Sequence, residues 1–255
     1  MARYQIILAY DGTEFIGSQR QAKKYRTVQG ELENALRKIG WDERSVLMAG
    51  RTDAGVHASG QVASFDLNWA HRLDALVNAL NANLPADMAV RWAQVAPDDF
   101  HPRFDATARR YRYRIFCQQQ RDPLRERYAW RVFPAPQEDV LHALAATLPG
   151  IHDFAAFGSP PRTDGSTQRH LMHAHWEKQD DEWHFEVQAN AFLYHMVRRL
   201  VRSQVVIAQG QFPKEIFARA LADQAELPSG IAPPNGLTLV EVSYPDDLES
   251  LKSKV

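Results

Sequence analysis

One short polar segment of the 255-residue chain, residues 50–60, contains side chains that can do acid–base or nucleophilic chemistry. Arg51, Asp53 and His57 lie in it, between two stretches that are typical of strands. A guanidinium two residues from a carboxylate would keep that carboxylate ionised, as a nucleophile must be. A second interpretation is open here, because Asp-Ala-Gly is also a common turn in which the aspartate only accepts hydrogen bonds from backbone amides. His57 fits either a role in this loop or a hydrogen bond to the backbone.

A second feature is a concentration of positive charge in a chain whose formal net charge is only −1. Between His101 and Arg131 there are nine arginines against three acidic residues. A protein can hold a phosphate backbone with one such stretch while staying neutral overall. The arginines are residues 103, 109, 110, 112, 114, 121, 125, 127 and 131.

The composition excludes several other classes of protein. Hydrophobic residues make up 45% and charged residues 24%, which is typical of a globular protein and not of a disordered one. The single cysteine, Cys117, excludes a disulfide framework and an all-cysteine metal site, and it suits the reducing cytoplasm, where we expect the protein to act. His170, His173 and His175 raise the question of a metal site, but in a strand only the last two share a face. We therefore expect no metal.

We also expect no membrane association and no targeting segment. No apolar run approaches the roughly 18 residues that a membrane-spanning helix needs. The apolar start of the chain reaches Asp11 and Gly12 before it could form the core of a signal peptide.

The elements that must position these residues follow from the hydrophobic periodicity. Residues 4–10 and 61–65 read as strands, 46–49 as a short strand and 88–95 as an alternating one. Two helices are predicted, one over residues 28–39 and one over 73–80. The order is β-α-β-β-α-β, which is the split βαβ or ferredoxin-like plan.

The second half of the chain repeats this order more loosely. It predicts a strand over 110–117, a helix over 137–148, a hairpin of 170–178 with 182–188, helices over 191–209 and 213–221, and a last strand over 237–244. The expected fold is therefore α+β, with two tandem ferredoxin-like units, and with domains at residues 1–103 and 104–255.

Five motifs in order along the chain resemble those of the tRNA pseudouridine synthase A (TruA) family. The segment Arg51-Thr52-Asp53-Ala54-Gly55-Val56-His57 resembles its signature. The other matches are Tyr10-Asp11-Gly12-Thr13 with Gly17 and Gln19-Arg20-Gln21, the helix start Val28-Gln29-Gly30-Glu31-Leu32, the central segments 100–106 and 109–113, and the C-terminal blocks 152–154 and 190–198. Because the matches span nearly the whole chain, they favour the catalytic interpretation of Asp53 over the turn.

The resemblance implies a fold and a reaction. The fold would be two tandem split βαβ, RRM-like units forming an antiparallel sheet flanked by helices. The reaction would be isomerisation of uridine to pseudouridine at positions 38, 39 and 40 of the tRNA anticodon stem-loop, without cofactor or metal. The enzyme would be a homodimer, since the family is one.

The resemblance also implies roles for individual residues. Asp53 would be the nucleophile, attacking C6 of the base or C1′ of the sugar after the uridine has been flipped out of its stem. Arg51 would fill the vacated space, and Tyr111 would stack on the uracil or assist proton loss at C5. Arg198 would pair with the aspartate, and we expect it to share one side of a helix with Tyr194, one turn earlier.

The segment Phe100-His101-Pro102-Arg103-Phe104 matches an RNA-contacting segment of the family, with Arg103 as the phosphate partner. Two positions depart from the family pattern. Ser18 stands where tryptophan is usual. The loop 159–168, where the family has a second tRNA contact, lacks the Cys/Ser-rich sequence that is usual there.

Two rival functions remain open on the residues alone. One is an RNA-binding module without catalysis, which would have no need of Asp53 together with Tyr111 and Arg198. The other is a hydrolase that uses Asp53 with His57, or a metal held by the histidines of 170–175.

Overall fold

The computed structural model describes residues 1–22, 25–162, 164–222, 226–227 and 229–245. The chain forms two compact units. Unit 1 consists of Met1–Thr107 with Thr238–Val255, and unit 2 consists of Ala108–Leu237.

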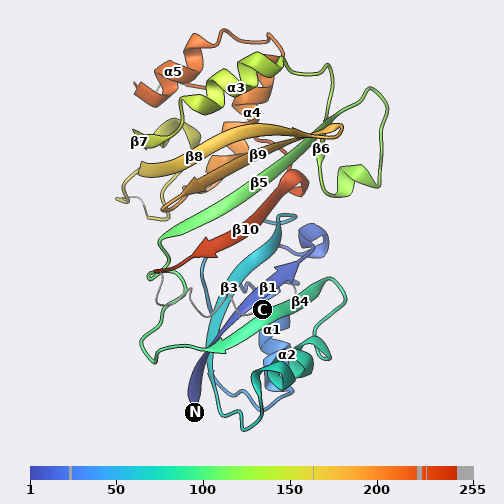
Figure 1. Cartoon of the computed structure of the whole chain (residues 1–255), viewed down its shortest axis with the longest axis vertical. Coiled ribbons are helices and arrows are strands. Elements are labelled where there is room, and N and C mark those ends of the chain that lie inside the picture. Colours follow the sequence, from blue (N-terminus) through green and yellow to red (C-terminus); the bar gives the residue numbers. More distant parts are fainter. Residues whose placement is uncertain (23–24, 163, 223–225, 228, 246–255) are drawn as a thin grey trace. The chain divides into compact units, whose positions relative to one another are not determined.

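Unit 1 has the expected β-α-β-β-α-β order. Its elements are β1 (Ala2–Tyr10), α1 (Val28–Arg37), β2 (Leu47–Met48), β3 (His57–Leu67), α2 (Leu73–Asn81) and β4 (Met88–Val95), with a 3-10 turn η1 at Gly12–Glu14. The strands pair antiparallel in the order β4-β1-β3-β2, which is the split βαβ topology (Figure 1). The ferredoxin-like plan is thus confirmed for this unit.

The core of unit 1 follows from the two periodicities of its sequence. Along β1 every second side chain from Tyr4 to Tyr10 is buried, as in a strand packed on one face. Along α1, Val28, Leu32 and Leu36 are completely buried, at the spacing of one helix face. Thr27 caps this helix, since its side chain accepts a hydrogen bond from Gly30 N at 3.3 Å.

By its position in the chain, the last strand, β10 (Leu237–Ser243), falls in the expected second domain, 104–255, and not in the first, 1–103. It pairs in parallel with the start of β3, at His57 and Ala58, so from Thr238 onward it belongs to unit 1 (Figure 1). The approach is close, because a Cβ on Gly60 would come within 2.1 Å of the Val240 carbonyl oxygen. Because residues 57 and 58 pair with β10, strand β3 begins at His57, before the predicted start at residue 61.

Unit 2 is also built on a mostly antiparallel sheet. Its elements are β5 (Ala108–Cys117), β6 (Trp130–Val132), α3 (Glu138–Ala146), β7 (Gly150–Asp153), β8 (Gln168–Gln179), β9 (Glu182–Ala189), α4 (Met196–Ala208) and α5 (Glu215–Ala222), with 3-10 turns η2 (Arg125–Arg127), η3 (Ala155–Phe157) and η4 (Pro234–Gly236). The strand order is β6-β5-β9-β8-β7, in which only the β5–β6 pair is parallel. The hairpin of β8 and β9 confirms the prediction, whereas the short strands β6 and β7 were not predicted.

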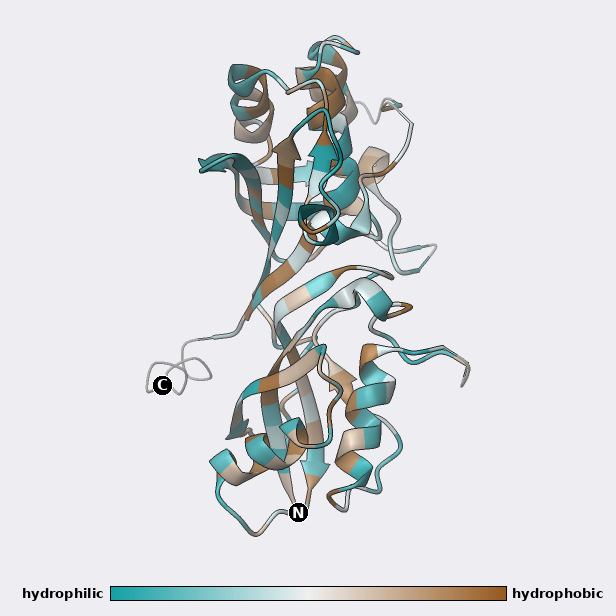
Figure 2. Ribbon diagram, turned by 90° about the vertical axis from the view of Figure 1, so that its right-hand side faces the viewer, coloured by the Kyte–Doolittle hydropathy of each residue, from teal (hydrophilic) through white to brown (hydrophobic). Residues whose placement is uncertain are grey.

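Helix α4 begins later than the predicted residue 191. His195 precedes it in a left-handed conformation (φ 66°), and Tyr194 N donates to the Ser159 carbonyl at 2.9 Å instead of entering the helix. The expectation that Tyr194 and Arg198 share one side of a helix is therefore wrong. The helices in Figure 2 carry both hydrophobic (brown) and hydrophilic (teal) bands, as expected of helices with one buried and one exposed side.

The α+β class is confirmed by these two sheets and their helices. Within the described residues, no helix has the length and apolar character to cross a membrane.

Candidate functional site

The loop that carries Asp53 is held in place by Ser18, the residue that stands where tryptophan is usual in the family pattern. Ser18 is buried, its N–H donates to the Thr52 carbonyl at 3.0 Å, and its Oγ accepts from Thr52 N at 2.8 Å. Both backbone groups of the residue preceding Asp53 are therefore satisfied by one serine. A serine hydroxyl can accept in this way, whereas an indole N–H only donates.

The side chain of Thr52 is fixed as well. Its Oγ1 shares a hydrogen bond of 2.8 Å with the Tyr10 hydroxyl, and Gln61 Nε2 donates to the Gly50 carbonyl at 3.0 Å. Burial raises the pKa of Tyr10 to about 12, against the opposing effect of hydrogen bonds with Thr52 and Gln61. The Tyr10 hydroxyl therefore stays protonated at neutral pH.

Two glycines of the preceding loop allow the close approach of the Asp53 loop. A Cβ on Gly12 would lie 2.0 Å from the Val56 carbonyl oxygen, so no other residue fits there without a shift. Gly17 has a φ of 82°, which favours glycine, and it packs beside the Thr52 carbonyl. The spacing of Asp11-Gly12 and Gly17 in the sequence thus serves to seat residues 50–56.

Within this loop Asp53 is half-buried, and Arg51 is exposed. Arg51 makes no hydrogen bond or ion pair with any residue that the structure describes, Asp53 included. Thr52 points inward to Tyr10, whereas the side chain of Arg51 is exposed to solvent. Arg51 is thereby accessible to a ligand.

His57 has the backbone role that the sequence allowed. It is buried at the start of β3, where its Nδ1 accepts from Gly12 N at 3.0 Å and lies 3.2 Å from Asp11 Oδ1. His57 therefore joins β3 to the loop that supports Thr52.

The predicted RNA-contacting segment divides into anchors and exposed residues. Phe100 and Pro102 are buried; Phe100 packs against Tyr244, with ring centroids 5.2 Å apart, and the Pro102 carbonyl accepts from the Tyr244 hydroxyl at 2.7 Å. These contacts fix the segment on unit 1.

Arg103 and Phe104 are the exposed residues of the segment, and His101 is half-buried beside them. Phe104 is 74% exposed, its ring lies 4.3 Å from that of His101, and the Arg103 guanidinium is 5.8 Å from it. His101 Nδ1 accepts from the backbone N–H of Arg103 at 3.2 Å, which shapes the turn. A cation and an exposed ring on a fixed turn can contact a phosphate and a base.

Tyr111 lies on the buried face of β5. It is 8% exposed, and its ring meets Phe192 edge to face at 5.0 Å. Its neighbour along this face, Tyr113, is fully buried and donates from its hydroxyl to the Pro233 carbonyl at 2.8 Å. Burial raises the pKa of Tyr113 well above its ordinary value, opposed by the nearby charge of Arg198.

Arg198 is half-buried in the first turn of α4. Its Nε donates to the Ala232 carbonyl at 2.8 Å, and its own carbonyl accepts from Ala232 N at 3.2 Å. These two hydrogen bonds with Ala232 fix the Arg198 side chain as far as its Nε atom. Tyr111 and Arg198 belong to unit 2, whereas Asp53, Arg51 and residues 100–104 belong to unit 1.

Most arginines of the basic stretch are paired with acidic residues, some distant in sequence and one within the stretch. Arg110 and Arg112 pair with Glu186, and Arg114 pairs with Glu182. Further along, Arg121 and Arg131 pair with Glu126, and Arg125 pairs with Asp181 and Glu182. The formal positive charge of this stretch therefore overstates what it offers to RNA.

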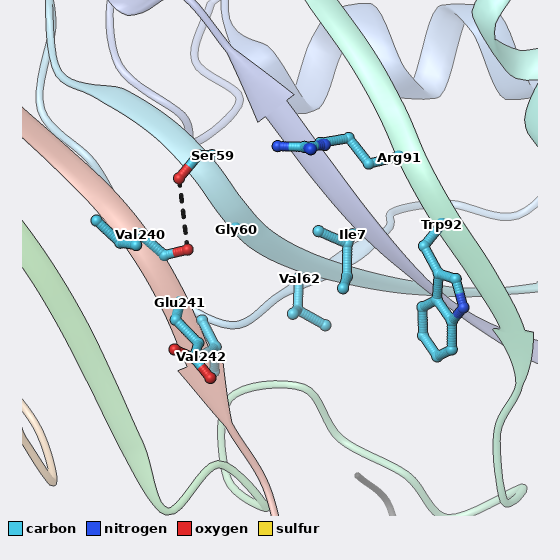
Figure 3. Close-up of a pocket in the computed structure, with 9 residues that line it drawn as sticks. All are labelled: Ile7, Ser59, Gly60, Val62, Arg91, Trp92, Val240, Glu241 and Val242. Atoms are coloured by element: carbon cyan, nitrogen blue, oxygen red, sulfur yellow. Dashed lines mark hydrogen bonds between the residues drawn. The ribbon is translucent and has the colours of Figure 1, made fainter. Parts of the chain in front are cut away.

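Other features of the surface do not involve the predicted site residues. His173 and His175 share a face of β8, with rings 5.9 Å apart, and no group of three or more potential metal ligands occurs among the described residues. A cavity of about 360 Å³ opens on the unit 1 sheet (Figure 3). Ile7, Val62 and Trp92 line it with Arg91, Ser59, Gly60 and β10 residues 240–242.

The fold and the site define an α+β protein with a carboxylate on a rigidly seated loop. A family model described as "tRNA pseudouridine synthase" matches residues 6–105 and 144–245. Three similar relatives carry the name tRNA pseudouridine synthase A. The protein of Histophilus somni (strain 2336) is 40% identical over 240 residues, covering 94% of this chain and 89% of that protein. The protein of Vibrio parahaemolyticus is 39% identical over 248 residues, covering 97% of this chain and 94% of that protein. The protein of Chloroflexus aurantiacus (strain ATCC 29366 / DSM 635 / J-10-fl) is 41% identical over 258 residues, covering 97% of this chain and 91% of that protein.

The chain belongs to the tRNA pseudouridine synthase family. It is accordingly an enzyme of the isomerase class, as the resemblance of its motifs implied.

Proposed function

We propose that this enzyme isomerises uridine to pseudouridine at positions 38, 39 and 40 in the anticodon stem-loop of tRNA, with Asp53 as the nucleophile. The observation that carries the proposal is the seating of the Asp53 loop. Thr52 is held through its backbone by Ser18 and through its side chain by Tyr10, and Asp53 follows it directly. A nucleophile must be held rigidly relative to the reacting atom.

The reaction breaks the bond between N1 of uracil and C1′ of ribose, and it forms a bond between C5 and C1′. Asp53 adds to C6 or C1′, and it is released once the base has rotated and been rejoined. The C5 proton is lost and N1 gains one, so no atoms are gained or lost overall. No oxidant or group donor takes part.

The other residues serve substrate binding. Arg51, exposed beside Asp53, enters the space that the flipped uridine leaves. Tyr111 faces the uracil, where it either stacks or takes the C5 proton, and Arg198 supplies the positive charge that holds the aspartate ionised. Support for these roles comes from the matching motifs and from the fixed positions of Tyr111 and Arg198 within unit 2.

Residues 100–104 contact the tRNA backbone through the side chains that face solvent. Arg103 reaches a phosphate, while His101 and Phe104 offer a ring surface to a base. Phe100 and Pro102 act as anchors of this turn.

We further propose that the enzyme works in the cytoplasm as a homodimer. Ion pairs neutralise much of the basic stretch, so one subunit offers a limited positive surface to a tRNA. A second subunit would extend that surface. Sedimentation of the free protein at working concentration is expected to give twice the monomer mass, and a monomeric mass would contradict the dimer.

The test of the function is release of tritium from an unmodified tRNA transcript labelled at uridine C5. Wild type is expected to release the label, and Asp53→Asn to bind the tRNA without releasing it. Asp42→Asn, which removes an exposed carboxylate of the same unit, is the matched control and is expected to behave as wild type. No release by wild type from tRNAs with uridine at 38–40, despite tight binding, would favour an RNA-binding module instead.

A further inference from the structure

Arg169, the second residue of β8, is a half-buried arginine with an unusual set of partners. Its Nη1 donates to the backbone carbonyls of Ser166 at 2.8 Å and Gln168 at 2.6 Å. Its Nε is buried and has no hydrogen-bond partner in the part of the chain that the structure describes. The guanidinium is therefore fixed in orientation by neutral groups alone.

No carboxylate balances the charge of Arg169 within the described residues. Burial lowers its pKa, and no acidic neighbour offsets that effect. Two other half-buried arginines of unit 2 do have carboxylate partners: Arg125 pairs with Asp181, and Arg131 pairs with Glu126. A half-buried guanidinium with no carboxylate partner can bind an anionic group through charge-assisted hydrogen bonds.

The surroundings of Arg169 are basic and polar. His152 lies opposite it on β7, and exposed Arg162 belongs to the loop that leads into β8. At the same end of the sheet, Asn190 accepts from His170 N at 3.1 Å through its side chain and from Arg109 Nη1 at 2.9 Å through its carbonyl. Arg109 of β5 therefore contacts Asn190, and Asn190 bonds to His170, the residue that follows Arg169.

We propose that Arg169 is a phosphate-binding residue and that its ligand is a phosphodiester of the RNA backbone. The Arg169 guanidinium is preorganised by the carbonyls of Ser166 and Gln168, and the planar guanidinium matches the geometry of a phosphate. The choice of RNA rests on the proposed function. The loop 159–168, of which Thr163 lies outside the described residues, directly precedes this arginine in the chain.

The experiment compares tRNA affinity of wild type, Arg169→Gln and Arg121→Gln across a series of salt concentrations. Arg121 is an exposed arginine of the same unit that is already paired with Glu126, so it is the matched control. Arg169→Gln is expected to bind about tenfold more weakly, which corresponds to one charge-assisted hydrogen bond. Its log–log salt dependence should be shallower by about one unit, because one fewer phosphate is neutralised. Arg121→Gln should match wild type in both respects.

A thermal unfolding measurement separates this role from a structural one. If Arg169 serves only the fold, Arg169→Gln loses stability and keeps its salt dependence, and that result would overturn the proposal. If it binds phosphate, the substitution removes an unpaired charge and leaves the unfolding temperature unchanged or higher.

Two further outcomes are informative. If inorganic phosphate protects wild type but not Arg169→Gln from unfolding, while tRNA affinity is the same for both, the ligand is a free anion and the RNA assignment is wrong. Failure of this inference is distinguishable from failure of the proposed function, because tritium release at saturating tRNA should be equal for wild type and Arg169→Gln. Absence of release from wild type would refute the function and leave the binding result standing.

Discussion

The substitution Ser18→Ala tests whether this serine positions the loop that carries Asp53. Ser18 is 1% exposed and Thr52 is 7% exposed, so water cannot replace the lost hydroxyl as acceptor for Thr52 N. A buried donor left without an acceptor costs about 1–3 kcal/mol. The hydrogen bond from Ser18 N to the Thr52 carbonyl remains, so the loop is expected to shift and not to unfold.

The expected loss of stability is read from urea unfolding, as a lower midpoint with an unchanged slope. The matched control is Ser203→Ala. Ser203 is as buried as Ser18, but its hydroxyl only donates to the Arg199 carbonyl, one helix turn earlier. That carbonyl keeps its helical partner, so the control is expected to cost less than about 0.5 kcal/mol.

The second readout of Ser18→Ala is the rate of tritium release from tRNA. Displacement of a nucleophile by about 1 Å can lower the rate on the order of a hundredfold, so kcat is expected to fall while KM for tRNA is unchanged. If Ser18→Ala matches Ser203→Ala in stability and wild type in kcat, the reasoning is refuted. Lower stability with an unchanged kcat would show that Ser18 supports the fold without positioning Asp53.

Three other substitutions have expected outcomes. Gly60→Ala forces a Cβ against the β10 backbone and should lower the free energy of unfolding, measured in urea, by at least about 2 kcal/mol. Its control is Gly50→Ala, which has no atom within 4 Å of the new Cβ and should be as stable as wild type. Equal stabilities of the two variants would contradict the β3–β10 packing. The hydrogen bonds of Arg26, more than its charge, lower the pKa of Asp87. The ionised Asp87 therefore stabilises the fold at a pH above its unfolded pKa of about 4. This stabilisation is lost as the pH falls through the pKa of Asp87 in the folded protein. Asp87→Asn should therefore lower the stability by about 1 kcal/mol at pH 7 and leave a smaller difference in acid, and a difference that grows on acidification would contradict the assignment. Glu186→Gln removes a buried carboxylate from half-exposed arginines and should cost about 1–3 kcal/mol, and an unchanged urea midpoint would show that the pairs contribute nothing.

Local periodicity was enough to predict most of the elements. The alternation over residues 110–117 separated Tyr111 and Tyr113 from the arginines between them, and the buried and exposed faces of β5 follow that division. The spacing of apolar residues likewise identified α1 and the hairpin of β8 and β9. Where it failed, a tertiary contact decided the outcome: the polar residues before 61 became strand because β10 and β1 pair with them.

The sequence by itself determined the family and the candidate residues, because the motif around Asp53 is contiguous in the chain. Only the tertiary structure decided which charges remain available. Arg112 and Arg114 meet acidic residues some 70 positions away, whereas Arg169 meets none among the described residues. Only the structure, likewise, gave Ser18 a role, since its bonds to Thr52 join residues 34 positions apart. Charge pairing and hydrogen bonding depend on distance in space, and a linear pattern does not contain that information.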